Sequence, residues 1–233
     1  MSERLESWAI ILSAGKGTRM KSNICKQYMQ VEGKPLLFYT LKAFEESTID
    51  HIVLVVGKND ASYVQKEIVD RYKIGKVHRI VIGGRERYDS VMNGLDVISD
   101  NGKVLVHDGA RPLIEVKYIN KMIDSLNENE ACIAAVPVKD TIKEVNEEGF
   151  VKNTPDRRRL WQVQTPQAFS VSLLKSAYNK MKINGSEGIT DDSMVVEKYT
   201  DTNVRIIECS YRNIKITTPE DLDFMKQVLE SGK

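Results

Sequence analysis

Short runs of apolar, largely β-branched residues recur along this chain and alternate with amphipathic stretches. Runs such as IVLVV and IAAV are apolar at every position, which is typical of parallel strands that helices cover on both faces. The pattern therefore predicts a sheet with alternating helices. The predicted strands are Trp8–Ser13, His51–Gly57, Val77–Ile82, Lys103–His107, Ala131–Val136 and Val204–Cys209.

Helices are predicted between these strands because apolar residues there recur every three or four positions. Pro35 is expected at the first position of its helix, and Thr218-Pro219 reads as an N-cap followed by a first helical residue. The alternation predicts an α/β, Rossmann-like, doubly wound fold that binds ligands beyond the carboxyl ends of its strands. The predicted helices are Pro35–Glu46, Asp60–Tyr72, Tyr118–Asn127, Val171–Lys182 and one beginning at Pro219.

The stretch Thr141–Pro166 interrupts this alternation. Its segment TIKEVNEEGFVKN alternates polar and apolar residues around Glu148-Gly149, as a β-hairpin does around its turn. We therefore expect one domain over residues 1–233 with a protruding β-arm at about 140–165.

Composition narrows the function classes. The 34 Lys and Arg residues balance 33 Asp and Glu residues, which argues against a general nucleic-acid or membrane binder. An anionic ligand must then be held by locally concentrated positive charge. The three cysteines form no close pair and the three histidines are scattered, so we expect a cytoplasmic protein without a zinc site.

The stretch LSAGKGTRM, Leu12–Met20, follows the apolar run Trp8–Ile11 and contains the end of the first predicted strand. It is not a Walker A motif, since Ile10 stands where the first glycine is needed, and it is not a dinucleotide fingerprint, since Met20 replaces the third glycine. Its small residues still allow backbone N–H groups to approach an anion, which Arg19 and Lys26 could neutralise. A glycine turn with surface cations is the alternative interpretation.

Two further segments place polar residues at strand ends. Gly83-Gly84 turns the chain ahead of a helix that has Ser90 near its start, and Asp108 ends the strand Lys103–His107 with Arg111 just after it. A carboxylate in that position suits a magnesium ion, while capping of a turn is its structural alternative.

Together these motifs resemble one enzyme family. The ordered set SAGKGTRM, KQY, GGRERYDSV, HDGARP, VKDTIK, TPDRRRLWQVQTPQ, TDDSMVVE and NIKITTPEDL is similar to the 2-C-methyl-D-erythritol 4-phosphate cytidylyltransferases, from about Ile10 to Leu222. The resemblance implies a reaction of CTP with methylerythritol phosphate that gives 4-diphosphocytidyl-methylerythritol and pyrophosphate in the non-mevalonate isoprenoid pathway. It also implies magnesium and a homodimer with interlocking β-arms.

The resemblance implies residue roles by matching motif. The residues expected around the reacting phosphates are Arg19, Lys26 and Lys215. Those expected at CTP are Ser13, Ala14, Gly15, Gly83, Ser90 and Asp108, with Asp108 also on the metal side. Those expected at the sugar phosphate are Arg111, Thr141, Arg157 and Thr165, with Thr141 and Arg157 supplied by the partner's arm.

Two positions depart from the family pattern, and two other functions remain open. Cys25 stands where the family usually has proline, and Arg212 stands where an acidic or other polar residue is expected. Ribitol-5-phosphate cytidylyltransferases share the loop, TPQ and NIKITTP, although the segment DRRRLW favours the isoprenoid enzyme. A non-catalytic nucleotide-binding protein is the more remote alternative, and it would bind CTP without releasing pyrophosphate.

Overall fold

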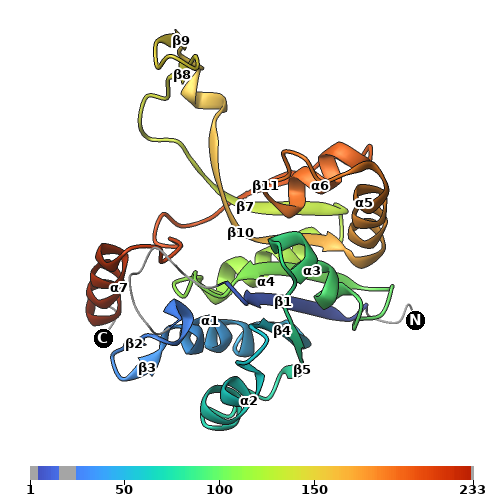
Figure 1. The fold of residues 1–233 in the computed structure, drawn as a ribbon, viewed down its shortest axis with the longest axis vertical. Helices are drawn as coiled ribbons and strands as arrows, with labels where there is room; N and C mark the ends of the chain where they lie inside the picture. Colours follow the sequence, from blue (N-terminus) through green and yellow to red (C-terminus); the bar gives the residue numbers. More distant parts are fainter. Residues whose placement is uncertain (1–4, 16–24, 232–233) are drawn as a thin grey trace.

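A seven-stranded sheet forms the centre of the protein (Figure 1), whose computed structural model describes residues 5–15 and 25–231. One strand is antiparallel to both of its neighbours, and the other pairings are parallel. The predicted α/β fold class and all six predicted strands are confirmed, with ends shifted by at most one residue. In spatial order the strands are β11 (Arg205–Glu208), β7 (Ala131–Pro137), β10 (Trp161–Ser170), β6 (Lys103–Asp108), β1 (Ser7–Ser13), β4 (His51–Val56) and β5 (Val77–Ile82).

The antiparallel strand β10 is missing from the sequence prediction. It begins at Trp161 and lies between β6 and β7, so the end of the segment predicted as an arm belongs to the central sheet. Its polar residues and Pro166 argue against a central strand. The structure accommodates them with a register shift between Val163 and Gln167, where the pairing with β7 is interrupted.

Helices cover both faces of the sheet, and alternate residues of β1 separate the two cores. Ala9 and Ile11 belong to the core under α1, α2 and α4, whereas Trp8 and Ile10 belong to the core under α3, α5 and α6. The helices on the first face are α1 (Leu36–Glu45), α2 (Ala61–Val64, continued by a π-helical segment, Gln65–Asp70) and α4 (Val116–Ser125). Those on the second face are α3 (Arg87–Leu95), α5 (Val171–Asn184) and α6 (Asp192–Tyr199).

The helix starts test the capping predictions. The final helix, α7 (Pro219–Ser231), begins at Pro219 as predicted, and Asp221 accepts hydrogen bonds from the N–H groups of Thr217 and Thr218. The prediction for Pro35 is wrong, because α1 begins one residue later. Pro35 instead belongs to the short strand β3 (Lys34–Pro35), which pairs with β2 (Gln30–Val31). Helix α6 was not predicted.

The β-arm projects away from the sheet (Figure 1). It contains the short antiparallel strands β8 (Glu144–Val145) and β9 (Val151–Asn153), followed by a 3-10 turn, Arg157–Arg159. Phe150 in the hairpin is 69% exposed. Within the described part of the chain, no helix is long and apolar enough to cross a membrane.

Candidate active site

A cavity of about 330 Å³ opens at the carboxyl ends of β1 and β6. This is the edge at which a doubly wound fold binds ligands. The residues around it come from segments that are far apart in sequence. They are Leu12–Gly15, Lys26, Gln27, Gly84–Arg87, Ser90, Asp108, Ala110, Lys215 and Thr217.

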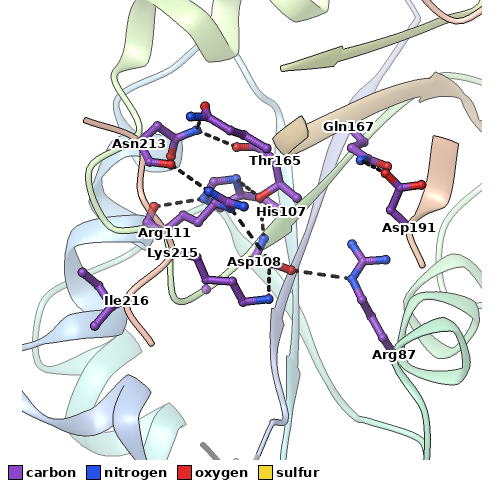
Figure 2. A network of polar contacts seen from close by, with 12 residues as sticks. Arg87, His107, Asp108, Arg111, Thr165, Gln167, Asp191, Asn213, Lys215 and Ile216 are labelled. Carbon is purple, nitrogen blue, oxygen red and sulfur yellow. Dashed lines mark hydrogen bonds and ion pairs between the residues drawn. The ribbon is translucent and has the colours of Figure 1, made fainter. Parts of the chain in front are cut away.

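Asp108 carries a buried negative charge at the edge of this cavity, with cations around it (Figure 2). Its carboxylate lies 2.8 Å from Lys215 Nζ, 3.7 Å from Arg87 Nε and 3.9 Å from Arg111 Nε. Burial by itself raises the pKa of Asp108, but the charges of Arg87, Lys215 and Arg111 lower that pKa well below its ordinary value. The carboxylate is therefore ionised at physiological pH.

Arg87 is a site residue that the sequence analysis missed. It is the first residue of α3, and its Nη1 and Nη2 donate to the two carboxylate oxygens of Asp192 at 2.9 and 2.7 Å. Asp192 is fully buried and also accepts a hydrogen bond from the Tyr178 hydroxyl. This bidentate pairing holds the guanidinium so that its Nε faces Asp108. The sequence signals were the arginine in GGRERYDSV and the acidic pair in TDDSMVVE, but nothing in the sequence pairs them.

Thr165 forms hydrogen bonds with the backbone of Asp108 and with His107. The Thr165 hydroxyl accepts a hydrogen bond from the Asp108 N–H and lies 3.0 Å from His107 Nδ1. His107 Nε2 lies 3.1 Å from the carbonyl oxygen of Arg111, so Nε2 carries the proton and Nδ1 accepts from Thr165. Burial lowers the pKa of His107 to about 4, which keeps the imidazole neutral. Thr165 is buried and does not line the cavity, so its contact with substrate stays a prediction.

The loop that carries Lys215 is fixed to the sheet by Asn213. Asn213 Nδ2 donates to the carbonyl oxygen of Thr165 and to Gln164 Oε1, and the Asn213 carbonyl oxygen accepts from Arg111 Nη1. Further along the loop, Lys26 Nζ donates to the carbonyl oxygen of Ile216 at 2.9 Å. The two lysines predicted to act on phosphates are thereby brought to the same cavity.

The residues at the end of β1 line another part of the cavity. Ser13 Oγ is buried and has no hydrogen-bond partner among the described residues, which makes it available to a ligand in the cavity it lines. Gln27 holds the adjoining backbone by donating to the carbonyl oxygens of Ser13 and Gly15. A Cβ on Gly15 would meet no atom of the described residues within 4 Å, and the small size of glycine leaves room for a ligand.

In the loop after β5, Gly83 and Ser90 have structural roles. A Cβ on Gly83 would lie 2.4 Å from the Ala14 Cβ, so this glycine is required for close packing of two cavity loops. Gly84, and not Gly83, lines the cavity. The Ser90 hydroxyl accepts from the Gly84 N–H at 3.1 Å, which fixes the loop.

The remaining predicted site residues lie elsewhere. Thr141 and Arg157 are exposed on the β-arm and are not among the residues lining the cavity; Arg157 Nη1 donates to the carbonyl oxygen of Lys139. Arg111 contacts Asp108 beneath the cavity, and Arg19 lies outside the described residues.

Neither of the two residues that depart from the family pattern lines the cavity. Cys25 has φ −55° and ψ 132°, a backbone that proline would also adopt, so the turn Lys26–Tyr28 keeps its start. Arg212 is exposed and lies outside the cavity lining.

Asp108 is the residue that fits a magnesium ion. It is an ionised oxygen donor at the edge of the cavity, and Mg²⁺ is commonly held by one or two carboxylates together with substrate phosphates. Among the described residues, no group of three or more His, Cys, Asp or Glu side chains could hold a metal ion. An ion held by Asp108 would take its other ligands from water and from a bound phosphate compound.

Comparison with known proteins connects this geometry to a family. Residues 8–231 match the family model described as 2-C-methyl-D-erythritol 4-phosphate cytidylyltransferase. A protein of that name from Lachnospira eligens is 49% identical over 217 residues, which cover 92% of this chain and 95% of the relative. One from Alkaliphilus oremlandii is 49% identical over 226 residues, covering 96% and 95%.

Solved structures agree with the sequence relatives. The crystal structure of 4-diphosphocytidyl-2C-methyl-D-erythritol synthase from Anaerococcus prevotii superposes with a TM-score of 0.86 at 34% identity, covering 97% of this chain and 96% of that one. The similarity therefore extends over nearly the whole chain.

Replacement of Arg87 should destabilise the protein far more than replacement of its neighbour Arg85. Arg87→Gln leaves the buried carboxylate of Asp192 without its arginine partner, which typically costs about 3–5 kcal/mol. The Arg85 side chain is 93% exposed, so Arg85→Gln should change the free energy of unfolding by less than about 0.5 kcal/mol. Urea unfolding of both variants measures the difference, and similar losses would contradict the role assigned to the Arg87–Asp192 pair.

Replacement of His107 should reduce the sensitivity of the protein to mild acid. The pKa of His107 is about 4 in the folded protein, against 6.5 ordinarily. Between these values the unfolded chain binds a proton that the native state does not, so stability falls as pH falls, by up to about 3 kcal/mol. The Asp108 carboxylate, whose pKa is lowered in the folded protein, contributes its own loss mainly as pH falls through and below its ordinary pKa of 3.8.

Urea unfolding at pH 4.5 and 7 should show a smaller pH effect in His107→Gln than in the unmodified protein. His78→Gln, which alters an exposed imidazole, is the matched control and should keep the full effect. Equal pH effects in all three proteins would show that His107 is not the buried neutral group.

Proposed function

Because the chain belongs to the 2-C-methyl-D-erythritol 4-phosphate cytidylyltransferase family, we propose that the cavity at the carboxyl ends of β1 and β6 is the CTP site of that enzyme. The chain is a nucleotidyltransferase that joins CTP to methylerythritol phosphate in isoprenoid synthesis and releases pyrophosphate. The observation that carries the site assignment is the ionised Asp108, which gathers Arg87, Arg111 and Lys215 beside the cavity.

The reaction joins two anions and needs no general base. The nucleophile is a phosphate monoester, whose second pKa is about 6, so it is mostly dianionic at neutral pH. Its oxygen attacks the α-phosphorus of CTP, and the bond to the β-phosphate oxygen breaks as pyrophosphate leaves. The protein must therefore hold two negative groups together and stabilise the charge that develops on the phosphate oxygens.

The residues of the site divide into those that stabilise the phosphates, those that contact CTP and one that would hold a metal ion. Lys215 lies on the loop before α7, and Lys26 Nζ contacts the carbonyl oxygen of the next residue, Ile216. Both lysines stabilise the phosphate oxygens, with Arg19 assigned to the same task by motif. Ser13, Ala14 and Gly15 contact CTP on the β1 side, with Gly83 and Ser90 forming the loop at the cytidine. Asp108 would hold Mg²⁺, which supplies further neutralisation of phosphate charge when bound.

A second protomer completes the site in this proposal. Thr141 and Arg157 lie on an arm that extends from the body of their own chain (Figure 1). Arg111 and Thr165 belong to the network around Asp108. We assign all four to methylerythritol phosphate, with Thr141 and Arg157 reaching the partner's cavity in a homodimer. The exposed Phe150 and Val151 of the hairpin support burial of the arm against another chain.

The two alternative functions, ribitol-5-phosphate cytidylyltransferase and a non-catalytic nucleotide-binding protein, gain no support from the relatives. The matching family model and the similar proteins named above are methylerythritol phosphate enzymes, and none of them favours ribitol phosphate. Lys26, Asp108 and Lys215 converge on one cavity, which suits catalysis better than nucleotide binding alone.

We also place the enzyme in the reducing cytoplasm. Cys25, Cys132 and Cys209 are free thiols, and the last two are buried. Burial raises the pKa of Cys132 to about 11, so this thiol stays protonated and inert.

Removal of the Lys26 charge should slow turnover much more than it weakens CTP binding. The ammonium acts most strongly on the charge that develops when the α-phosphate has five oxygens around it. Lys26→Ala should lower kcat by about 100-fold or more and change the Kd for CTP by less than about tenfold. Pyrophosphate release and calorimetric titration measure the two quantities. A variant with normal kcat and only a raised KM would remove Lys26 from the chemical step.

Mixed dimers test whether Arg157 acts on the partner's site. Lys26→Ala and Arg157→Ala homodimers should both be nearly inactive. In a dimer with one chain of each kind, both defects fall on one site and the other site is intact. Dimers isolated through two different affinity tags should therefore regain about half the activity of the unmodified enzyme. If verified mixed dimers stay inactive, Arg157 acts within its own chain and the shared site is wrong.

A further inference from the structure

The arm leaves the sheet through a narrow root. We define the arm root as Pro137–Lys139 on the outgoing side and Leu160 on the returning side. Trp161 pairs with Pro137 at the end of the sheet, and the Val138 N–H donates to the carbonyl oxygen of Leu160 at 3.1 Å. Beyond the root, residues 140–154 are exposed, so the direction of the arm depends on how its root is held.

Tyr211 contacts the arm root from a different part of the chain. Its ring lies 3.6 Å from Lys139 Nζ, and its hydroxyl donates to the carbonyl oxygen of Pro137 at 2.7 Å. The carbonyl oxygen of Lys139 in turn accepts from Arg157 Nη1 at 2.9 Å. One tyrosine therefore holds the outgoing strand at two residues, and the second of these contacts an arginine assigned to the substrate.

The loop of Tyr211 is itself fixed to the sheet near the active site. Gln164 Nε2 donates to the carbonyl oxygen of Ser210, and Asn213 Nδ2 donates to the carbonyl oxygen of Thr165. The residues on either side of Tyr211 are therefore hydrogen-bonded to strand β10 of the central sheet, and through Tyr211 these contacts restrain the arm root. A small rotation at the root would displace the tip of the arm much further than the root.

We propose that Tyr211 is a positioning residue that sets the direction of the arm, and so the place at which Thr141 and Arg157 meet substrate. The inference rests on the proposed shared site. Nothing in the sequence motifs singles out Tyr211, because its partners lie more than 70 positions away along the chain, as in the Tyr211–Pro137 hydrogen bond. It acts through the arm and touches no reacting atom.

Substitution of Tyr211 should affect methylerythritol phosphate and spare CTP. Tyr211→Leu removes both the cation–π contact and the hydrogen bond, and Tyr211→Phe removes only the hydrogen bond. We expect the KM for methylerythritol phosphate to rise about tenfold in the leucine variant and less in the phenylalanine variant. The KM for CTP should stay within about twofold.

Tyr199→Leu is the matched control. Tyr199 also has a lysine over its ring, Lys198 at 5.7 Å, and its hydroxyl also donates to a backbone carbonyl oxygen, that of Gly185. Its position at the end of α6 is separate from the arm root, so both KM values should be unchanged. Hydrogen exchange over residues 137–160 should become faster in Tyr211→Leu and stay unchanged in Tyr199→Leu.

Mixed dimers distinguish action through the arm from action within the same chain. A Lys26→Ala chain paired with a Tyr211→Leu chain has one cavity that is intact and receives an unmodified arm. At low methylerythritol phosphate, that site should work at the rate of an unmodified site. If it shows the raised KM of the Tyr211→Leu homodimer, Tyr211 acts on its own cavity and the proposal is overturned.

The mixed dimers also distinguish failure of the Tyr211 proposal from failure of the proposed shared site. If Lys26→Ala complements Arg157→Ala but not Tyr211→Leu, the shared site stands and the role of Tyr211 is wrong. If neither pair complements, the shared site itself fails, and the role of Tyr211 fails with it. Unchanged hydrogen exchange at the arm in Tyr211→Leu would also contradict the proposal.

Discussion

Asp108 places a negative charge inside the protein at the edge of the cavity at the carboxyl ends of β1 and β6, and much of the surrounding structure compensates for it. Arg87, Arg111 and Lys215 come from three separate segments and converge on one carboxylate. Burial of a charge is costly unless it is paired and hydrogen-bonded. The backbone N–H of Asp108 is also held, by the Thr165 hydroxyl. The result is a fixed anion with three cations around it, two of which, Arg87 and Lys215, also line the cavity.

Each compensating cation has a support of its own. Arg87 is held by the buried Asp192, and Arg111 by the carbonyl oxygen of Asn213. Lys215 lies in the same loop as Asn213, two residues after it, and the side chain of Asn213 is hydrogen-bonded to Gln164 and Thr165 of the central sheet. In a chain with a formal net charge of +1, positive charge that acts on phosphates must be gathered locally in this way. The same loop bears Tyr211, which connects the cation cluster to the arm root.

The sequence predicted the parts of the fold that local patterns determine. β-Branched apolar runs identified six strands of the parallel framework, and Asp108 was correctly placed at a strand's carboxyl end. Strand β10 escaped prediction because Pro166 and its polar neighbours oppose a central strand, and only pairing with β6 and β7 stabilises it. Arg87 and Asp192 were missed for a related reason: they are 105 positions apart in sequence, so their pairing exists only in the folded chain.

The central claim is that Asp108 is the ionised group on which the cations and a magnesium ion depend. Calorimetric titration of CTP at a series of magnesium concentrations, with the unmodified protein and Asp108→Asn, tests it most directly. Asparagine keeps the shape of the side chain but removes the charge that attracts a divalent cation. The account predicts that the variant needs roughly tenfold or more magnesium for the same CTP affinity. An identical magnesium dependence in the two proteins would contradict it.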